Sequence, residues 1–301
     1  MRPDILGQHG IVAAGRHYSV AAGVRILQQG GNAIDAGVAS VLAAAVVEIS
    51  HFGFGGESPV IIHDAKTKKV VVISGQGTAP KAATPDLFAE KGIIDPNGPL
   101  ATTVPAVMDA MALALDGYGT MRFEQVMQPA IELADGFPMY AFLRQYLISE
   151  REKSEIHEGT KRAYYPEGTI PEVGDVFRQP DLARTLRAIV AAEKAAYART
   201  KNRRKAIRAA RDAFYKGDIA KRIAEGTRKA GGVLAYADLA TYEGAIEEPV
   251  STTFHGYTVH KAGPWNQGPV LLQALTLLEG FDLRAMGHNS AEYLHTLHEA
   301  V

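Results

Sequence analysis

The glycine-rich stretch EISHFGFGGESPV, from Glu48 to Val60, is the first segment whose residue types could serve chemistry. It follows a long alanine-rich run and precedes an apolar run typical of a strand. Phosphate-binding glycine loops have the opposite order, strand then loop then helix, because the amides and dipole of the helix N-terminus hold the anion. The lysine and the serine or threonine of a P-loop are also missing here. We therefore do not expect a nucleotide site at this loop.

The histidines do not form a metal-binding pattern. The closest pairs are His255 with His260 and His295 with His298, and no HExxH motif accompanies them. Cysteine is absent, which excludes disulfides, thiolate metal sites and a cysteine nucleophile. We expect neither a metal nor another cofactor.

The sequence offers no convincing nucleophile. A serine nucleophile of the hydrolase type would need a pattern such as G-x-S-x-G, which is missing. The segment ATTVP, with Thr102 and Thr103, invites comparison with threonine hydrolases whose nucleophile is freed by self-cleavage. Loop threonines before a helix that starts at a proline are the simpler interpretation, so no catalytic residue is assigned to this chain.

One run of basic residues could suggest nucleic-acid binding. Its members are Lys201, Arg203, Arg204, Lys205, Arg208 and Arg211. No aromatic or base-reading residue is interleaved with them, so we interpret the run as a solvated helix face. The formal net charge of -1 also gives no overall field that would attract nucleic acid or membrane.

The glycine-rich stretch is preceded by elements with clear local signals. GIVAAG, from Gly10 to Gly15, is predicted to be a strand, and HYSVAAGVRILQQGG has the apolar spacing of a helix that ends at its glycines. Asn32 can then cap AIDAGVASVLAAAVVE, whose apolar residues fall on every side and predict a buried helix. This helix leads directly into the loop.

Two strand-like runs follow, PVIIHD (59–64) and KVVVIS (69–74), and a polar turn between them predicts an antiparallel hairpin. From about 105 to 245 the pattern is mostly helical. It includes a helix after Pro105 and, between Pro180 and Gly217, one long helix or two joined near Asn202. Strand-like alternation then returns over EPVSTTFHGYTVHKAG (248–263), and helices follow after Pro269 and from Ser290.

The sequence shows no membrane or export signal. The longest apolar stretch, Val38 to Val47, is about half of the roughly 20 residues that a membrane span needs. The start, MRPDILGQHG, lacks the apolar core of a secretory signal. We expect a cytoplasmic protein, or a periplasmic or secreted one if the N-terminus was trimmed.

Several blocks resemble the gamma-glutamyltransferase (gamma-glutamyltranspeptidase) family. They are GIVAAGRHYSVAAGVRILQQGGNAIDAGVASVLAAAVVE, TVPAVMDAMALALDGYGTMRFEQVMQPAIELADGF, AFYKGDIAKRIAEGTRKAGGVLAYADLATYEGAIEEPVSTTFHGYTVH and PWNQGPVLLQALTLLEGFDL. The resemblance implies an α/β (α+β) fold, an αββα sandwich of the N-terminal nucleophile hydrolase type. Such enzymes cut themselves into a large and a small subunit, and the new N-terminal Thr of the small subunit is the nucleophile.

On this resemblance, residues 1–301 are a single large-subunit segment of an αββα domain, with a mostly helical portion at about 105–245. The expected partner is the small subunit that carries the Thr, and the expected substrate is a small-molecule amide. The family's helix, glycine loop and hairpin pack together beside the active site. The resemblance therefore places Gly55, Gly56 and Glu57 in the pocket wall. Glu57, Ser58 and Pro59 depart from the family's usual glycine and aromatic residues, which indicates either a narrower or more acidic wall or an ordinary turn variant.

A second departure concerns the segment SGQGTAP. In transpeptidases an Arg just before an Ala-Pro pair holds the alpha-carboxylate of the gamma-glutamyl group, and Gln76 occupies that position here. Glutamine lacks the charged bidentate fork of Arg. Losing that contact would cost roughly 1.5 to 3 kcal/mol. We expect Gln76 to bind a neutral amide or carbonyl, with Gly75 and Gly77 opening space around it, or else to cap a turn.

Three functions follow as hypotheses. The first is the large subunit of an amide hydrolase or acyltransferase that acts on an amide other than glutathione. The second is a true gamma-glutamyltransferase or glutathione hydrolase whose carboxylate partner is Arg16 or an Arg of the small subunit. The third is a non-catalytic binding or assembly protein of the same fold.

Overall fold

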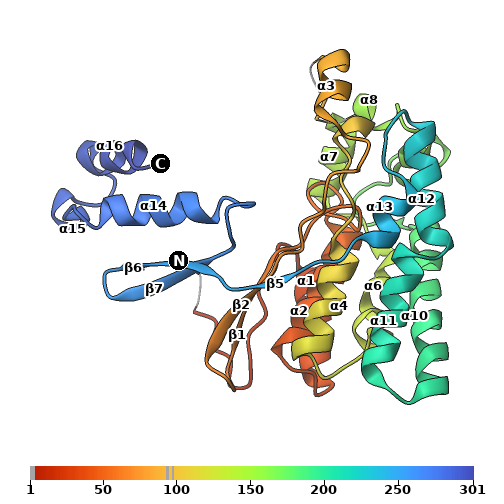
Figure 1. Ribbon diagram of the computed structural model, residues 1–301, viewed down its shortest axis with the longest axis horizontal. Coiled ribbons are helices and arrows are strands. Elements are labelled where there is room, and N and C mark those ends of the chain that lie inside the picture. Colours follow the sequence, from red (N-terminus) through yellow and green to blue (C-terminus); the bar gives the residue numbers. More distant parts are fainter. Residues whose placement is uncertain (1–3, 93–94, 97) are drawn as a thin grey trace. The chain divides into compact units, whose positions relative to one another are not determined.

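The computed structural model describes residues 4–92, 95–96 and 98–301. They form two compact units (Figure 1). Unit 1 comprises Met1–Glu57 and Gln76–Glu243, and unit 2 comprises Ser58–Gly75 and Gly244–Val301. Because the chain leaves unit 1 and returns to it, each unit is assembled from segments that are distant in sequence.

Unit 1 begins with two packed helices, α1 (His17–Gln28) and α2 (Ala33–Val47). Asn32 caps α2 as predicted: its side chain accepts hydrogen bonds from the amides of Ile34 and Asp35, and the Asp35 carboxylate accepts one from the Asn32 amide. Asp35 is fully buried and also accepts from the Thr120 amide and hydroxyl. The same carboxylate therefore caps α2 and holds the loop that contains Thr120.

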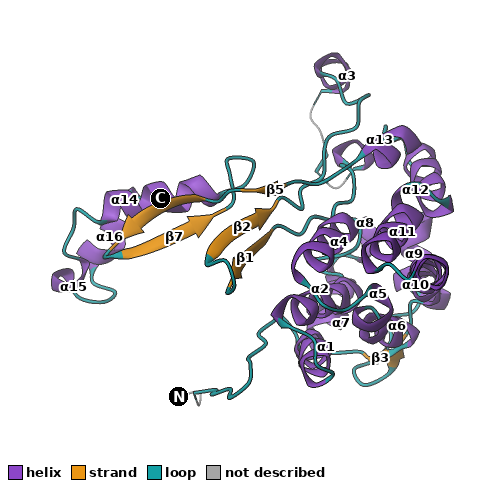
Figure 2. Cartoon of the chain, turned by 60° about the horizontal axis from the view of Figure 1, so that its bottom comes forward, coloured by secondary structure: helices purple, strands orange, loops and turns teal. Residues whose placement is uncertain are grey.

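The predicted burial of α2 is also confirmed. Most of its residues are buried and only Ala33 and Gly37 are exposed, since α1, α4 and α6 pack against the helix (Figure 2). Its buried residues include Ala36, Ala39, Leu42, Ala43 and Val46. A helix that is apolar on all sides is stable only inside such a layer of helices.

The remainder of unit 1 is mostly helical. Its helices are α3 (Pro85–Lys91), α4 (Val107–Tyr118), α5 (Phe123–Val126), α6 (Gln128–Asp135), α7 (Ala141–Ser149), α8 (Arg151–Ser154), α9 (Glu158–Tyr164), α10 (Pro180–Thr200), α11 (Arg203–Tyr215), α12 (Asp218–Lys229) and α13 (Tyr236–Thr241). Two short 3-10 helices, η1 (Pro99–Ala101) and η2 (Pro166–Gly168), and one two-stranded pairing, β3 (Phe137–Pro138) with β4 (Val176–Phe177), complete it.

The segment between Pro180 and Gly217 forms two helices. Lys201 has a left-handed backbone with φ of 52°, and the Asn202 side chain accepts a hydrogen bond from the Lys205 amide at 3.0 Å. A left-handed residue ends α10, and the new cap starts α11. Of the two alternatives left open by the sequence, the break at Asn202 is the correct one.

The basic run, which extends from Lys201 at the end of α10 into α11, is only partly a solvated face. Lys201, Arg204, Lys205 and Arg208 are exposed as expected. Arg211 is not, because its side chain is only 2% exposed and forms an ion pair with Asp109. The prediction was wrong for Arg211 because its carboxylate partner lies 102 residues earlier in the chain.

Unit 2 contains the predicted hairpin and most of the remaining strands. The strands β1 (Val60–Asp64) and β2 (Lys69–Ile73) pair antiparallel, and β5 (Ile246–Glu247) adds to β2. A second hairpin joins β6 (Val250–Phe254) to β7 (Tyr257–Lys261), and α14 (Gly268–Leu278) packs on it (Figure 2). The helices α15 (Leu283–Met286) and α16 (Ala291–Glu299) follow.

The strand predicted at Gly10–Gly15 is missing. Gly10–Gly15 is irregular rather than a strand, and Ile11 in it is 63% exposed. An apolar run becomes a strand only when another strand supplies hydrogen-bond partners, and none pairs with it among the described residues.

No helix in the described ranges is both long and apolar enough to span a bilayer.

Candidate functional site

The segment that contains Gln76 is held by backbone hydrogen bonds. The Gly75 carbonyl oxygen accepts from the Ser58 amide at 2.9 Å, and the Thr78 carbonyl oxygen accepts from the Val104 amide at 3.0 Å. Between them, the Gln76 carbonyl oxygen accepts from the Tyr242 hydroxyl at 2.8 Å. The Gln76 side chain is half-buried and has no hydrogen-bond partner among the described residues.

The two glycines beside Gln76 are required by close backbone approach. Gly75 has φ of 53°, a conformation that L residues rarely adopt, and a Cβ there would overlap the Ser58 carbonyl. A Cβ on Gly77 would overlap the Val104 carbonyl oxygen. Neighbouring backbone fills the positions that side chains would take, so the expected open space is not found on those sides of the two glycines.

The glycine-rich loop makes a turn whose end is fixed to the same part of unit 1. The Gly56 amide donates to the Gly53 carbonyl at 3.0 Å, and the Gly56 carbonyl accepts from the Ala106 amide at 2.9 Å. Gly55 is exposed, with open space where a Cβ would stand. Close packing explains the glycines at 75 and 77 but not the one at 55.

Residues 104 to 106 thus connect two of the predicted parts of the site. Val104 bonds the segment that follows Gln76, and Ala106 bonds Gly56. Glu57 ends this part of unit 1 with an exposed side chain that makes no hydrogen bond or ion pair within the described part of the chain. The structure therefore brings Gln76, Gly77 and Gly56 to one short stretch before α4.

Beneath this stretch lies a buried tyrosine network, which we define as Asp109, Arg211, Tyr215 and Tyr242. The Tyr215 hydroxyl donates to the Pro105 carbonyl at 2.6 Å and accepts from the Asp109 amide at 3.2 Å. The Arg211 guanidinium bonds both the Asp109 carboxylate and the Tyr242 carbonyl. It also lies 4.6 Å from the centre of the Tyr215 ring, which is 5.6 Å from the Tyr242 ring.

Both hydroxyls of this network remain protonated well beyond neutral pH. Burial, with a smaller contribution from the Asp109 charge, raises the pKa of Tyr242 to about 12. The same causes raise the pKa of Tyr215 further. Each tyrosine therefore serves as a constant hydrogen-bond donor to a backbone carbonyl. This network cannot be identified from the sequence, because its members are scattered over 134 positions and only Arg211 stands out, as part of a basic run.

Arg16, the alternative carboxylate partner, is committed to local contacts. Its Nη1 donates to the Gly15 carbonyl at 2.8 Å, and its guanidinium lies 4.7 Å from the Phe142 ring centre and 5.3 Å from that of Tyr140. Its buried Nε has no hydrogen-bond partner. The cation is therefore held on an aromatic surface formed by Phe142 and Tyr140.

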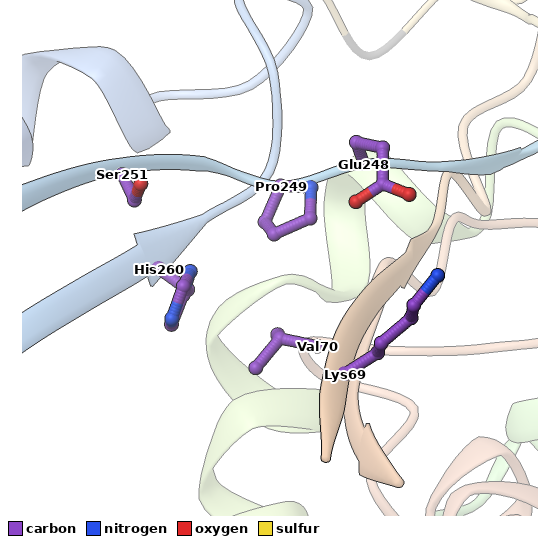
Figure 3. Close-up of a pocket in the computed structure, with 6 residues that line it drawn as sticks. All are labelled: Lys69, Val70, Glu248, Pro249, Ser251 and His260. Atoms are coloured by element: carbon purple, nitrogen blue, oxygen red, sulfur yellow. The ribbon is translucent and has the colours of Figure 1, made fainter. Parts of the chain in front are cut away.

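Unit 2 has a separate open pocket of about 300 Å³ (Figure 3). It is lined by Lys69, Val70, Glu248, Pro249, Ser251 and His260. None of the predicted site residues lines it. His260 was considered only as a metal ligand, and no group of three potential metal-binding side chains occurs among the described residues. The pocket lining combines a lysine, a glutamate and a histidine, and this combination does not indicate one class of ligand.

Comparison with known proteins finds similarity to one family along most of the chain. A family model described as gamma-glutamyltranspeptidase matches residues 19–301. The glutathione hydrolase-like YwrD proenzyme of Bacillus subtilis is 33% identical over 303 residues, covering 100% of this chain and 54% of that protein. The chain spans about half the length of the curated relatives it matches.

Solved structures agree with this result. The crystal structure of Helicobacter pylori gamma-glutamyltranspeptidase has a TM-score of 0.88 at 29% identity, covering 99% of this chain and 82% of that one. That of cephalosporin acylase from Bacillus halodurans has a TM-score of 0.81 at 30% identity, covering 94% of this chain and 51% of that one. These likenesses confirm the predicted α/β fold class, that of the N-terminal nucleophile hydrolases.

Proposed function

This chain belongs to the gamma-glutamyltranspeptidase family, and from that premise we propose that it is the large-subunit part of a self-processed heterodimeric amide hydrolase or acyltransferase. In this proposal residues 1–301 form a single large-subunit segment of an αββα domain. The N-terminal Thr of a separate small subunit attacks the substrate carbonyl, and its amine is the base. The amine product leaves, and water or an acceptor amine then resolves the acyl-enzyme ester. No residue of this chain takes part in bond making.

The lengths of the relatives support the division into two subunits. This chain corresponds to about half of the proenzymes it resembles but to 82% of the Helicobacter pylori chain in its crystal structure. Both fractions are expected if a proenzyme is divided into two chains and this one corresponds to the larger.

We propose further that the substrate is an amide other than glutathione. The observation that carries this proposal is Gln76, a neutral residue with a free side chain, at the position where the resemblance places a carboxylate-binding Arg. A glutamine amide donates and accepts, which suits a neutral amide or carbonyl. It lacks the charge-assisted pair that a carboxylate needs. The likeness to a cephalosporin acylase also supports an amide outside the gamma-glutamyl class.

Gly55, Gly56 and Glu57 complete the proposed pocket wall, with Gly75 and Gly77 fixing the backbone on either side of Gln76. Glu57 carries an exposed carboxylate without an ion pair among the described residues. The negative charge of Glu57 disfavours a substrate that carries a carboxylate nearby, because like charges repel at short range. Gln76 and Glu57 thus select against the same group.

The test is a comparison of two anilides with the processed product of the complete gene. We expect the unmutated enzyme to cleave a neutral acyl anilide faster than a gamma-glutamyl anilide. Gln76→Arg should raise kcat/KM for the gamma-glutamyl anilide about ten- to a hundredfold, the worth of one charged contact. Efficient cleavage of the gamma-glutamyl anilide by the unmutated enzyme would overturn the substrate proposal.

Glutathione hydrolysis is the second candidate, because proenzymes with that name are among the relatives. It would require another carboxylate partner, such as Arg16 or an Arg of the small subunit. If Arg16 serves, Arg16→Met should raise KM for the gamma-glutamyl anilide and leave a neutral anilide unaffected. Equal effects on both anilides would mean that Arg16 has a structural role on the aromatic surface and does not bind the substrate carboxylate.

A further inference from the structure

We infer that Tyr242 is a positioning residue, which fixes Gln76 for contact with the substrate. This inference rests on the proposed function, because it takes Gln76 to be the residue that recognises the amide. Tyr242 does not touch the substrate itself. It acts through its hydrogen bond to the Gln76 carbonyl, 166 positions away in sequence.

Tyr242 is well suited to this role because it is held at both ends. Its side chain is only 4% exposed, and its ring packs on that of Tyr215. Its own carbonyl accepts a hydrogen bond from the buried Arg211 guanidinium. A donor fixed in this way transmits its position to the atom that it bonds, which is the carbonyl oxygen of Gln76.

Gln76 needs such a restraint. It stands between Gly75 and Gly77, and glycine allows more backbone conformations than any other residue. The Gln76 side chain has no partner of its own within the described residues, so only the backbone fixes the point from which its amide reaches the substrate. Hydrogen-bond strength falls steeply with misalignment. A small rotation of the 75–77 backbone would therefore weaken the contact with the substrate.

Tyr215 supplies a matched control. It belongs to the same buried network and also donates to a backbone carbonyl, but that carbonyl belongs to Pro105. Tyr242→Phe and Tyr215→Phe each remove one buried hydroxyl and keep the ring. A purely structural role predicts similar effects from both variants, whereas the positioning role predicts that only Tyr242→Phe changes recognition of the amide.

The experiment is a double-mutant cycle in the processed heterodimer, with Tyr242→Phe and Gln76→Ala measured alone and together on the neutral anilide. We expect Tyr242→Phe to raise KM about three- to tenfold, the worth of one hydrogen bond, with a smaller change in kcat. In the Gln76→Ala background it should have no further effect, because the side chain that it positions is gone. Tyr215→Phe should leave KM unchanged.

Each alternative outcome contradicts the inference in a recognisable way. If Tyr242→Phe reduces kcat/KM by the same factor with and without the Gln76 side chain, Tyr242 acts elsewhere. If Gln76→Ala itself changes nothing, the proposed role of Gln76 fails, and the inference fails with it. If Gln76→Ala raises KM but Tyr242→Phe does not, the proposed function stands and the inference alone is wrong.

A second variant gives a readout that does not depend on removing a group. A fluorinated tyrosine at position 242 keeps the shape of the ring but ionises at lower pH, and a phenolate cannot donate a hydrogen bond. We expect a new alkaline rise in KM that is absent after Gln76→Ala. A KM that stays unchanged at pH values where the absorbance of the fluorinated ring shows it to be ionised would overturn the inference.

Discussion

At the scale of single residues, the buried ion pair of Arg211 and Asp109 illustrates what local sequence patterns cannot reveal. In the sequence Arg211 is part of a basic run, and only the fold brings it to Asp109. The link from Tyr242 to Gln76 is equally long-range. Gln76 could be chosen as a site residue because it departs from a family pattern, but its support could not be predicted.

Removing one partner of this ion pair should strongly destabilise the protein. Arg211→Met leaves the Asp109 carboxylate buried without its cation, and we expect a loss of about 3–5 kcal/mol in the free energy of unfolding. Arg204→Met, which breaks an exposed pair with Asp116, should cost less than about 1 kcal/mol. Urea unfolding of both variants measures the difference, and equal losses would contradict the assigned importance of burial.

The raised pKa of Tyr242 should make the free energy of unfolding depend on pH in the alkaline range. Its pKa is about 12 in the folded chain, above the ordinary value of 10. The folded state therefore keeps a proton that the unfolded state releases, so the stabilisation is complete below pH 10 and is lost as pH rises towards 12. Unfolding measured between pH 8 and 11.5 should show a shallower alkaline decline in Tyr242→Phe. An identical decline would contradict the raised pKa.

At the scale of elements, the sequence predicted those whose signals are local. The Asn32 cap, the even apolar distribution of α2 and the polar turn between β1 and β2 each act within a few residues, and all three appear in the structure. Gly10–Gly15 failed as a strand because strand formation depends on a partner that local sequence does not specify. The break between α10 and α11 could be placed, since Asn202 is a local cap.

The glycines of the candidate site give an element-scale prediction. Gly77→Ala forces a Cβ onto the Val104 carbonyl oxygen, so the two backbone segments must separate, and we expect a loss of about 1–3 kcal/mol in stability. Gly55→Ala meets open space and should change stability by less than about 0.5 kcal/mol. Thermal unfolding compares the two. Equal tolerance would mean that the segments at 77 and 104 are not closely packed.

At the scale of the whole molecule, unit 2 leaves many large apolar side chains exposed for its size. They are Ile61, Ile246, Tyr257, Val270, Leu271, Leu277, Phe281, Leu294 and Val301. We propose that the small subunit covers at least part of these side chains, because large exposed apolar patches mark interaction sites. We expect this chain alone to bind a hydrophobic dye strongly and the processed heterodimer to bind it weakly. Equal dye binding would show that the companion does not cover this surface.

The central claim is that this chain is one of two polypeptides cut from a single precursor and that the reactive hydroxyl lies on the other. Mass spectrometry of the natively purified product of the complete gene tests it most directly. We expect two chains, and the smaller one should begin with Thr. It would be contradicted by a preparation of this chain alone, free of any companion, that folds stably and hydrolyses an amide.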